Sequence, residues 1–374
     1  MNKFTMVIPS YWGRSRGNQG GQGGEQVVFD HPTRLDEEGT LGRLLESLDV
    51  FDLVAGRIVV ISVANEEQIA GQVQTKVDEI IRPYRSRYDI VNFGTDTLAK
   101  VRENLTAGGL GNAALELVNL NSYAAVRNMC ALAGILDGSE YTIFIDDDEL
   151  FTDTHFLRKI DENMGREING ETITALAGYY LQPDTYRLDN SNVPAWRRPY
   201  WNNTAVMNTA FDKIIGRGER LKPTPFVFGG NMTISRQVLR QVPFDPQITR
   251  GEDIDFLLNL RIAGITFYLD RELAIKHLPP PSQQKPWKKL SEDAIRFLYD
   301  RKKVQDHAVL DPARLQPYPG QFLGDDLPER IVKTSELLRQ ELIAQGNEQG
   351  SQECEKIAAM VKENQWGQID TGHG

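Results

Sequence analysis

Short apolar segments alternate with longer segments of helical periodicity through roughly the first two-thirds of the chain, which is typical of βα units on a mostly parallel sheet. The predicted strands are Phe4–Pro9, Arg57–Val63, Asp89–Phe93 and Tyr141–Ile145. Between the last two strands, Asn121–Leu136 has apolar residues at helical spacing, with Ser122 placed to cap the helix and Gly138 to end it. The pattern therefore predicts an α/β fold.

The C-terminal part of the chain has a different pattern. After three prolines at 279–281, the sequence changes to helical segments such as Ser291–Val304 and Glu329–Gln345, followed by a Gln/Glu/Gly-rich stretch. We therefore predict a main domain over residues 1–278 and a helical C-terminal extension with a polar tail over residues 279–374. The extension either covers the main domain or mediates self-association, and the sequence leaves a homo-oligomer open.

The composition excludes several classes of protein. The chain has 374 residues, of which 40% are hydrophobic and 25% charged, as expected for a globular protein. Its net charge of -10 argues against nucleic acid as the main partner. The N-terminal residues do not resemble a signal peptide, no apolar run reaches membrane-spanning length, and two cysteines do not make a disulfide framework. We expect a cytoplasmic protein with no integral membrane segment.

The strand Tyr141–Ile145 ends in four adjacent carboxylates, Asp146-Asp147-Asp148-Glu149. Like charges at the end of a strand repel one another unless a cation, most simply a divalent metal, lies among them. This end of a parallel sheet is also where ligands collect. If the segment stays extended, Asp146 and Asp148 face the same ion and Asp147 points elsewhere. The alternative is a solvated acidic turn or helix start.

Three further motifs follow the acidic segment: Gly229-Gly230-Asn231, then Gly251-Glu252-Asp253 at the start of a predicted helix, and His277 at the end of an apolar strand. The last two also have a purely structural explanation. Carboxylates suit the positive end of a helix dipole, and a single histidine is often a packed or surface residue.

The order of these motifs, with Ala125-Val126-Arg127-Asn128 ahead of the acidic strand, resembles the GT-A glycosyltransferases, especially family-2-like members, over about residues 3–278. The resemblance implies a Rossmann-like, mostly parallel mixed sheet flanked by helices. It also implies a nucleotide-diphosphate sugar as donor, Mn²⁺ or Mg²⁺ as cofactor, and an acceptor hydroxyl on a saccharide or small molecule. The metal would neutralise charge that develops on the departing nucleoside diphosphate.

The resemblance also implies roles for single residues. Asp148 would ligate the metal, Asp146 would act through the metal, its waters or the ribose, and His277 would be a further ligand that favours Mn²⁺. Asp253 would be the general base of an inverting enzyme, with Glu252 orienting the acceptor. The residues left for donor binding are Asp146, Asp147, Arg127, Asn128, Gly230 and Asn231.

Two departures from the family pattern narrow this interpretation. The second strand lacks the acidic ending with which many members bind the nucleobase of the donor. The identity of the nucleobase therefore stays open. The Gln-x-x-Arg-Trp motif of processive members does not follow His277, which favours transfer of a single sugar. The alternatives are a sugar-1-phosphate nucleotidyltransferase, whose Gly-rich loop is not found here, and a non-catalytic nucleotide-sugar-binding or scaffold protein.

Two segments stay without an assigned role. The segment Gly13–Gly24 contains six glycines, and its spacing fits neither the dinucleotide fingerprint nor the P-loop. It is a phosphate-contacting loop, a flexible lid or a plain insertion. Trp196, Tyr200 and Trp201 lie among arginines and asparagines, which makes that segment a candidate loop for stacking on sugar rings, or a loop folded onto the core.

Overall fold

The computed structural model describes residues 3–15, 29–30, 32–282 and 284–363. The chain divides into two compact units. The sheet unit consists of residues 1–185 and 219–283, and the helical unit consists of residues 186–218 and 284–374. This grouping places residues 186–218 with the C-terminal helices, and the domain boundary after residue 278 stays a prediction. Most of the glycine-rich segment, residues 16–24, lies outside the described residues.

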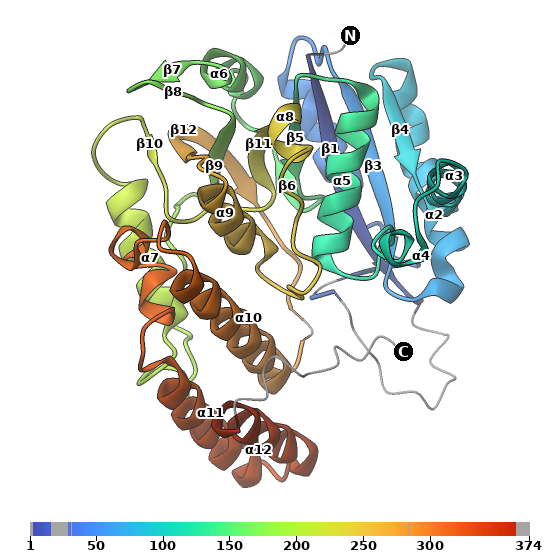
Figure 1. The fold of residues 1–374 in the computed structure, drawn as a ribbon. Helices are drawn as coiled ribbons and strands as arrows, with labels where there is room; N and C mark the ends of the chain where they lie inside the picture. The colour runs from blue at the N-terminus through green and yellow to red at the C-terminus, as the bar shows by residue number, and fades with distance from the viewer. Residues whose placement is uncertain (1–2, 16–28, 31, 283, 364–374) are drawn as a thin grey trace. The chain divides into compact units, whose positions relative to one another are not determined.

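The sheet unit is built on a mixed, mostly parallel sheet with the strand order β10-β12-β9-β11-β5-β1-β3-β4 (Figure 1). These strands are β1 (Phe4–Gly13), β3 (Arg57–Ala64), β4 (Ile90–Phe93), β5 (Tyr141–Ile145), β9 (Ala175–Leu181), β10 (Leu221–Pro223), β11 (Asn231–Ser235) and β12 (Phe267–His277). Four short strands complete the set within the described residues: β2 (Thr33–Arg34) pairs with β1, β6 (Glu149–Leu150) pairs with β12, and β7 (Glu167–Ile168) pairs with β8 (Glu171–Thr172). The predicted fold class is confirmed.

Parallel pairing dominates the N-terminal half of this sheet. Strand β1 pairs in parallel with both β3 and β5, and β3 pairs in parallel with β4. Strand β11 is antiparallel to both β5 and β9, whereas β12 is parallel to β9. The reversal at β11 places the start of that strand beside the carboxyl end of β5, since Asn231 pairs with Ile145.

Helices cover both faces of the sheet. They are α1 (Leu41–Ser47), α2 (Ala70–Ile81), α3 (Thr95–Ala107), α4 (Asn112–Leu115), α5 (Tyr123–Asp137), α6 (Phe156–Asn163), α8 (Arg236–Leu239) and α9 (Glu252–Ile262). Figure 1 shows α5 and α9 in front of the sheet. Side chains at alternate positions of β1, such as Met6 and Ile8, pack on the opposite face with Leu44 of α1 and Val73 of α2. This alternation is the period-two pattern of a strand buried on both faces.

The best-predicted elements are those with clear end signals. Strand β5 has the predicted bounds. Helix α5 begins after Ser122, whose hydroxyl accepts the backbone N–H of Ala125 at 3.2 Å, and ends at Gly138 with φ 78°. Both ends follow local rules, because a serine side chain satisfies a free helix N–H and glycine tolerates the left-handed conformation.

The helical unit contains α7 (Asn203–Ile214), α10 (Pro286–Asp306), α11 (Leu327–Ala344) and α12 (Glu348–Lys362). Helix α12 extends the helical structure into the polar tail as far as residue 362, and the sequence pattern did not predict this helix. Cys354, Ile357 and Val361 are buried on one side of α12, and their spacing is helical. A side chain at Gly350 would collide with the ring of Trp287, so the glycine permits close packing.

Trp201 forms the centre of the aromatic core of the helical unit. Its ring centroid lies 5.2 Å from that of Phe322 and 6.0 Å from that of Phe297. Trp201 is 0% exposed and Trp196 is 7% exposed, so neither ring offers a face to a sugar. Of the three aromatic residues in this predicted loop, Tyr200 alone is half-buried. Within the described residues, no helix combines the length and apolar character needed to cross a bilayer.

Candidate functional site

The four carboxylates after β5 form a tight turn. Strand β5 ends at Ile145 and β6 begins at Glu149, whose N–H donates to the carbonyl of Asp146 at 3.3 Å. The expectation of an extended segment, with two aspartates facing the same way, is therefore wrong. The cause is the antiparallel pairing of β6 with β12, which requires the chain to turn directly after β5. We refer to Asp146–Glu149 as the acidic turn.

Asp146 is held by Arg127 of α5. The guanidinium contacts both carboxylate oxygens of Asp146, with Nη1–Oδ1 at 2.9 Å and Nη2–Oδ2 at 3.2 Å. On its other side, Nε of Arg127 donates to Oε1 of Glu252 at 3.2 Å. Burial alone would lower the pKa of Arg127, but the carboxylates of Asp146 and Glu252 outweigh it and raise the pKa well above its usual value. Arg127 is thus a buried brace between the acidic turn and α9.

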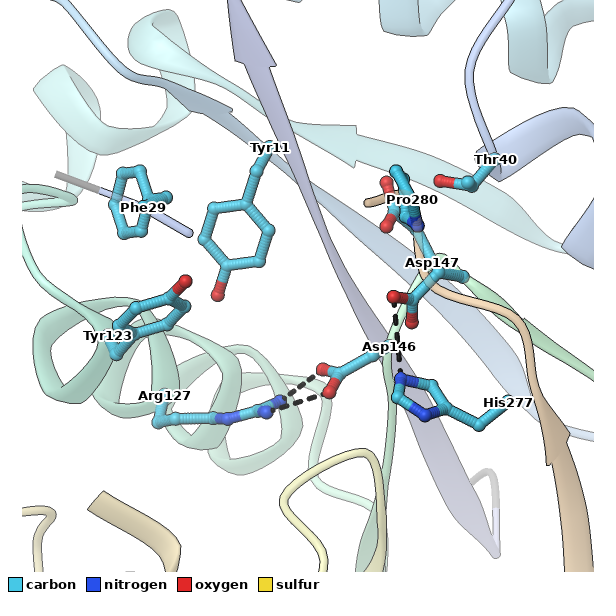
Figure 2. Close-up of a pocket in the computed structure, with 10 residues that line it drawn as sticks. Tyr11, Phe29, Thr40, Tyr123, Arg127, Asp146, Asp147, His277 and Pro280 are labelled. Atoms are coloured by element: carbon cyan, nitrogen blue, oxygen red, sulfur yellow. Dashed lines mark hydrogen bonds and ion pairs between the residues drawn. The ribbon is translucent and has the colours of Figure 1, made fainter. Parts of the chain in front are cut away.

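Asp148 lies beside His277. Oδ2 of Asp148 is 3.5 Å from Nε2 of His277, and the backbone carbonyl of Asp148 accepts the N–H of Leu278 at 2.9 Å. The imidazole stacks on the ring of Tyr180 at 4.3 Å, and its Nδ1 is 2.8 Å from Nε2 of Gln182. These contacts fix the ring with Nε2 toward Asp148. In Figure 2, His277 and Arg127 lie on opposite sides of Asp146.

Of the other two carboxylates of the acidic turn, Glu149 is buried and Asp147 is half-buried, and both lie among like charges. Oδ2 of Asp147 accepts the hydroxyl of Ser10 at 2.6 Å, yet burial and the charge of Asp148 raise the pKa of Asp147 to about 8. Burial, followed by the charges of Asp146 and Asp148, raises the pKa of Glu149 well above its usual range. Both shifts express the same cost, which is negative charge held close together in a poorly solvated place. A bound cation would remove much of that cost.

The acidic turn opens into a small pocket in the sheet unit, with a volume of about 90 Å³. The rings of Tyr11, Phe29 and Tyr123 form one wall, with centroids 4.6 to 5.6 Å apart. The remaining lining residues are Thr40, Arg127, Asp146, Asp147, Asp148, His277 and Pro280 (Figure 2). The volume is below the roughly 300–1,000 Å³ of most small-molecule sites, so the pocket fits an ion and part of a ligand.

The donor set suits a hard or borderline divalent metal. A carboxylate and an imidazole at 3.5 Å have about the spacing of two neighbouring ligands on one ion. Within the part of the chain that the structure describes, no group of three or more His, Cys, Asp or Glu side chains is placed to hold a metal. If a metal binds here, Asp148 and His277 would provide only part of its coordination shell, and a ligand or water would have to supply the rest.

Glu252 and Asp253 begin α9 after Gly251, which has φ 75°. Glu252 is 7% exposed and turned toward Arg127, so its contact is with the brace. Asp253 is half-buried, and its Oδ1 accepts the N–H of Ile254 at 2.8 Å. The residues that line the 90 Å³ pocket do not include Asp253. The structure thus joins Glu252 to the acidic turn and leaves the role of Asp253 as a prediction.

Two other predicted donor-binding residues, Asn128 and Asn231, make hydrogen bonds that hold neighbouring segments of the site together. Asn128 exchanges two hydrogen bonds of 2.9 Å with the backbone of Phe244. Nδ2 of Asn231 donates to the carbonyls of Tyr179 and Leu273, at 3.2 and 3.1 Å. Their amides are therefore used for fold contacts, and donor binding by either residue stays a prediction.

Gly230 allows the acidic turn to pack closely. A Cβ at this position would lie 2.2 Å from Oε1 of Glu149 and 2.6 Å from the carboxylate of Asp146. Its N–H donates to the hydroxyl of Tyr180 at 2.9 Å. A side chain here would displace a carboxylate of the acidic turn, which explains glycine at this position without a contact to a ligand.

Several residues of the site were not predicted from the sequence. Tyr11, Phe29 and Tyr123 come from three separate segments, and Tyr180 and Gln182 come from β9 and the residues directly after it. A single aromatic residue near the end of a strand carries no local signal of a pocket wall. The one usable indication was that the first strand continues beyond Pro9 and so includes Tyr11.

The comparison with protein-family models gives no match, and neither does the comparison with curated proteins. Among solved structures, the chain is similar to the mannosyltransferase PcManGT from Pyrobaculum calidifontis in complex with GDP-Man and Mn²⁺. The TM-score is 0.52 and the sequence identity is 12%, over 98% of this chain and 88% of the other. It also matches GalNAc-T7 with UDP, GalNAc and Mn²⁺, at TM-score 0.41 and 12% identity, over 97% of this chain and 58% of the other. The strand order and the first of these likenesses show that the chain has a GT-A fold.

Proposed function

We propose that this protein is a metal-dependent glycosyltransferase that moves a single sugar from a nucleotide-diphosphate sugar to a hydroxyl group of a saccharide or small molecule. The observation that carries the proposal is the acidic turn at the carboxyl end of β5, with Asp148 facing His277 across 3.5 Å on a GT-A fold. The fold-related mannosyltransferase was solved with a nucleotide sugar and Mn²⁺, which supports the same classes of ligand here.

Asp148 and His277 would hold the metal, and phosphate oxygens of the donor with water would complete its coordination. When bound, Mn²⁺ or Mg²⁺ would supply positive charge against the diphosphate leaving group. The imidazole favours Mn²⁺ over Mg²⁺. Tyr180 and Gln182 keep the ring of His277 in place, as second-layer contacts do for metal-ligating histidines.

The geometry supports a positioning role for Arg127. Its side chain is 4% exposed and contacts both Asp146 and Glu252, so a phosphate would have to compete with two carboxylates for it. Arg127 would instead fix Asp146 for contact with the donor, directly or through the metal's waters. Glu252 would then orient the guanidinium, in place of the acceptor role that the family resemblance implies.

Asp253 would be the general base of an inverting reaction. It is half-buried at the N-terminus of α9, one residue after the contact of Glu252 with the brace. A base there would take the proton from the acceptor hydroxyl as the oxygen attacks the anomeric carbon. Proton NMR of the first product formed reports the anomeric configuration and so tests inversion.

Calorimetric titration tests the donor site. Purified protein is titrated with a panel of nucleoside diphosphates and nucleotide sugars, each with and without Mn²⁺, and the panel is repeated on Asp148→Ala. We expect binding that needs both the metal and Asp148. The nucleotide that binds most tightly then identifies the nucleobase of the donor. The matched control is Asp52→Ala, an exposed aspartate outside the acidic turn, which should bind as the wild type does.

A donor panel that gives no metal-dependent binding would contradict the proposal. Metal-dependent binding that survives Asp148→Ala would keep the enzyme class and reject the ligand assignment. Slow release of nucleoside diphosphate from the bound donor, measured without added acceptor, would then separate a transferase from a protein that only binds the donor.

A further inference from the structure

The helical unit contains a pocket of its own, with a volume of about 580 Å³. It lies at the N-terminal half of α11 and the two segments that precede α7 and α11. The lining residues are Pro199, Tyr200, Gln316, Gly320, Gln321, Gly324, Asp326, Glu329, Arg330 and Lys333. This volume is within the range of about 300–1,000 Å³ that holds small molecules. None of these residues belongs to the acidic pocket, so the helical unit offers a separate candidate site.

Arg330 organises this pocket. Its Nε donates to the backbone carbonyl of Tyr200 at 3.0 Å, and its Nη1 donates to the carbonyl of Gln321. The guanidinium also lies 4.9 Å from the centroid of the buried Phe322 ring. One side chain thus ties the segment before α7 to the segment before α11. The two lining segments are held in place by contacts within the protein.

Glycine shapes one wall of the pocket. A Cβ on Gly320 would lie 2.8 Å from Nε2 of Gln316, so the amide of Gln316 lies directly over the glycine. Gln321 is exposed on the same segment. Each glutamine amide offers both a donor and an acceptor to a ligand. Two such groups beside the half-buried ring of Tyr200 give a polar wall with one aromatic surface.

The charges of the pocket balance. The lining includes two acidic side chains, Asp326 and Glu329, and two basic side chains, Arg330 and Lys333. Nζ of Lys333 pairs with Oε1 of Glu329 at 2.5 Å and lies 5.2 Å from the centroid of the Tyr200 ring. The cations are therefore engaged, Arg330 by two carbonyls and Lys333 by a carboxylate. An anionic ligand would have to displace these contacts, whereas a neutral ligand rich in hydroxyl groups would use them.

We infer that this pocket binds a neutral saccharide. The C–H face of a sugar ring would pack on Tyr200, in the place where Nζ of Lys333 now lies, and sugar hydroxyls would bond to the glutamine amides and the paired charges. The inference does not depend on sugar transfer in the sheet unit. It assigns the half-buried aromatic residue of the 196–201 segment to ligand binding, and leaves both tryptophans in the core.

Saturation-transfer NMR on the full chain tests this inference. The probes are methyl glycosides of glucose, mannose, galactose and N-acetylglucosamine, together with maltose, mannobiose, lactose and chitobiose. We expect signal transfer to at least one probe and a loss of affinity of about tenfold or more in Tyr200→Ala, while Tyr200→Phe keeps the ring and the affinity. The matched control is Tyr299→Ala. Tyr299 is also half-buried in the helical unit with a lysine, Lys303, over its ring at 4.9 Å, but it does not line the pocket.

Two more measurements make the outcome decisive. Asp148→Ala should bind the same saccharide with unchanged affinity, which separates this pocket from the donor site. Lys333→Ala removes one hydrogen-bond donor but uncovers the tyrosine ring, so it should lower saccharide affinity less than Tyr200→Ala does. The inference is overturned if no probe binds, if binding is indifferent to Tyr200→Ala, or if inorganic phosphate binds in its place and Lys333→Ala abolishes that binding.

Discussion

The acidic turn and the N-terminus of α9 are both rich in carboxylates, yet folding explains only one of them. At α9, Glu252 pairs with Arg127, and Asp253 accepts a backbone N–H in the first helical turn, where the helix dipole favours negative charge. At the acidic turn, burial and neighbouring carboxylates raise the pKa of Asp147 to about 8. Acidic residues that stay close together despite their mutual repulsion are the stronger indication of a ligand, because the contacts within the chain do not offset that repulsion.

The largest expected effect is on α9. Asp253→Asn removes the proposed base but keeps the shape of the side chain and an oxygen that can accept the N–H of Ile254. We expect the rate of transfer to fall by about 10²–10⁴-fold with the affinity for the donor unchanged. The measurement is a single-turnover rate with a screened acceptor, combined with calorimetry of the donor.

Asp96→Asn is the matched control, since Asp96 is also an acidic residue in the first turn of a helix, α3. It should transfer sugar at the wild-type rate. If Asp253→Asn also transfers at that rate, the acidic residues of α9 have a structural role alone, and the two regions differ even more than proposed.

The second effect concerns the brace that links the two regions. Arg127→Met leaves the carboxylates of Asp146 and Glu252 facing each other across a buried site without their cation. We expect the free energy of unfolding to fall by about 3–5 kcal/mol, the usual result of removing one partner from a buried ion pair. Urea unfolding followed by circular dichroism measures it.

Arg158→Met is the control for the expected loss of stability in Arg127→Met. The side chain of Arg158 is 64% exposed and pairs with Glu162 at 3.4 Å within a single helix. An exposed pair contributes little, so this variant should unfold close to the wild type. A similarly small change in Arg127→Met would mean that the buried contacts rearrange, and that Arg127 is available to a phosphate after all.

Local rules were enough to predict much of the sheet unit. The strand β5 and the helix α5 have end signals within a few residues: an apolar run that stops at charges, a serine cap and a glycine stop. The helix at Glu252 follows from the same logic. In the polar tail, by contrast, the apolar face of α12 is made of Cys354, Ile357 and Val361 among many polar residues, and the pattern was too sparse to predict a helix.

The geometry of the site depends on contacts between distant residues. Arg127 and Glu252 are 125 positions apart, and His277 meets Asp148 because β6 pairs with β12. That pairing also requires the chain to turn after Ile145. The side chains of the acidic turn therefore do not alternate between two sides, as they would in an extended segment. Residue types and their order thus indicate candidate groups for a site, whereas tertiary pairing decides which of them face one another.

The smallest expected effect is a change in the free energy of unfolding when one charge is removed from each region. It gives the most direct comparison, because the change should have opposite signs in the two regions. In protein treated with a chelator, Asp148→Asn removes a charge that raises the pKa values of Asp147 and Glu149, so we expect the free energy of unfolding to rise by roughly 0.5–1 kcal/mol. Glu252→Gln weakens a charged contact of Arg127 and should lower the free energy of unfolding by about 1–3 kcal/mol. Thermal and urea unfolding of both variants measure this difference. A loss of stability in Asp148→Asn equal to that in Glu252→Gln would show that the acidic turn also serves the fold, and the case for a metal would then rest on the titrations alone.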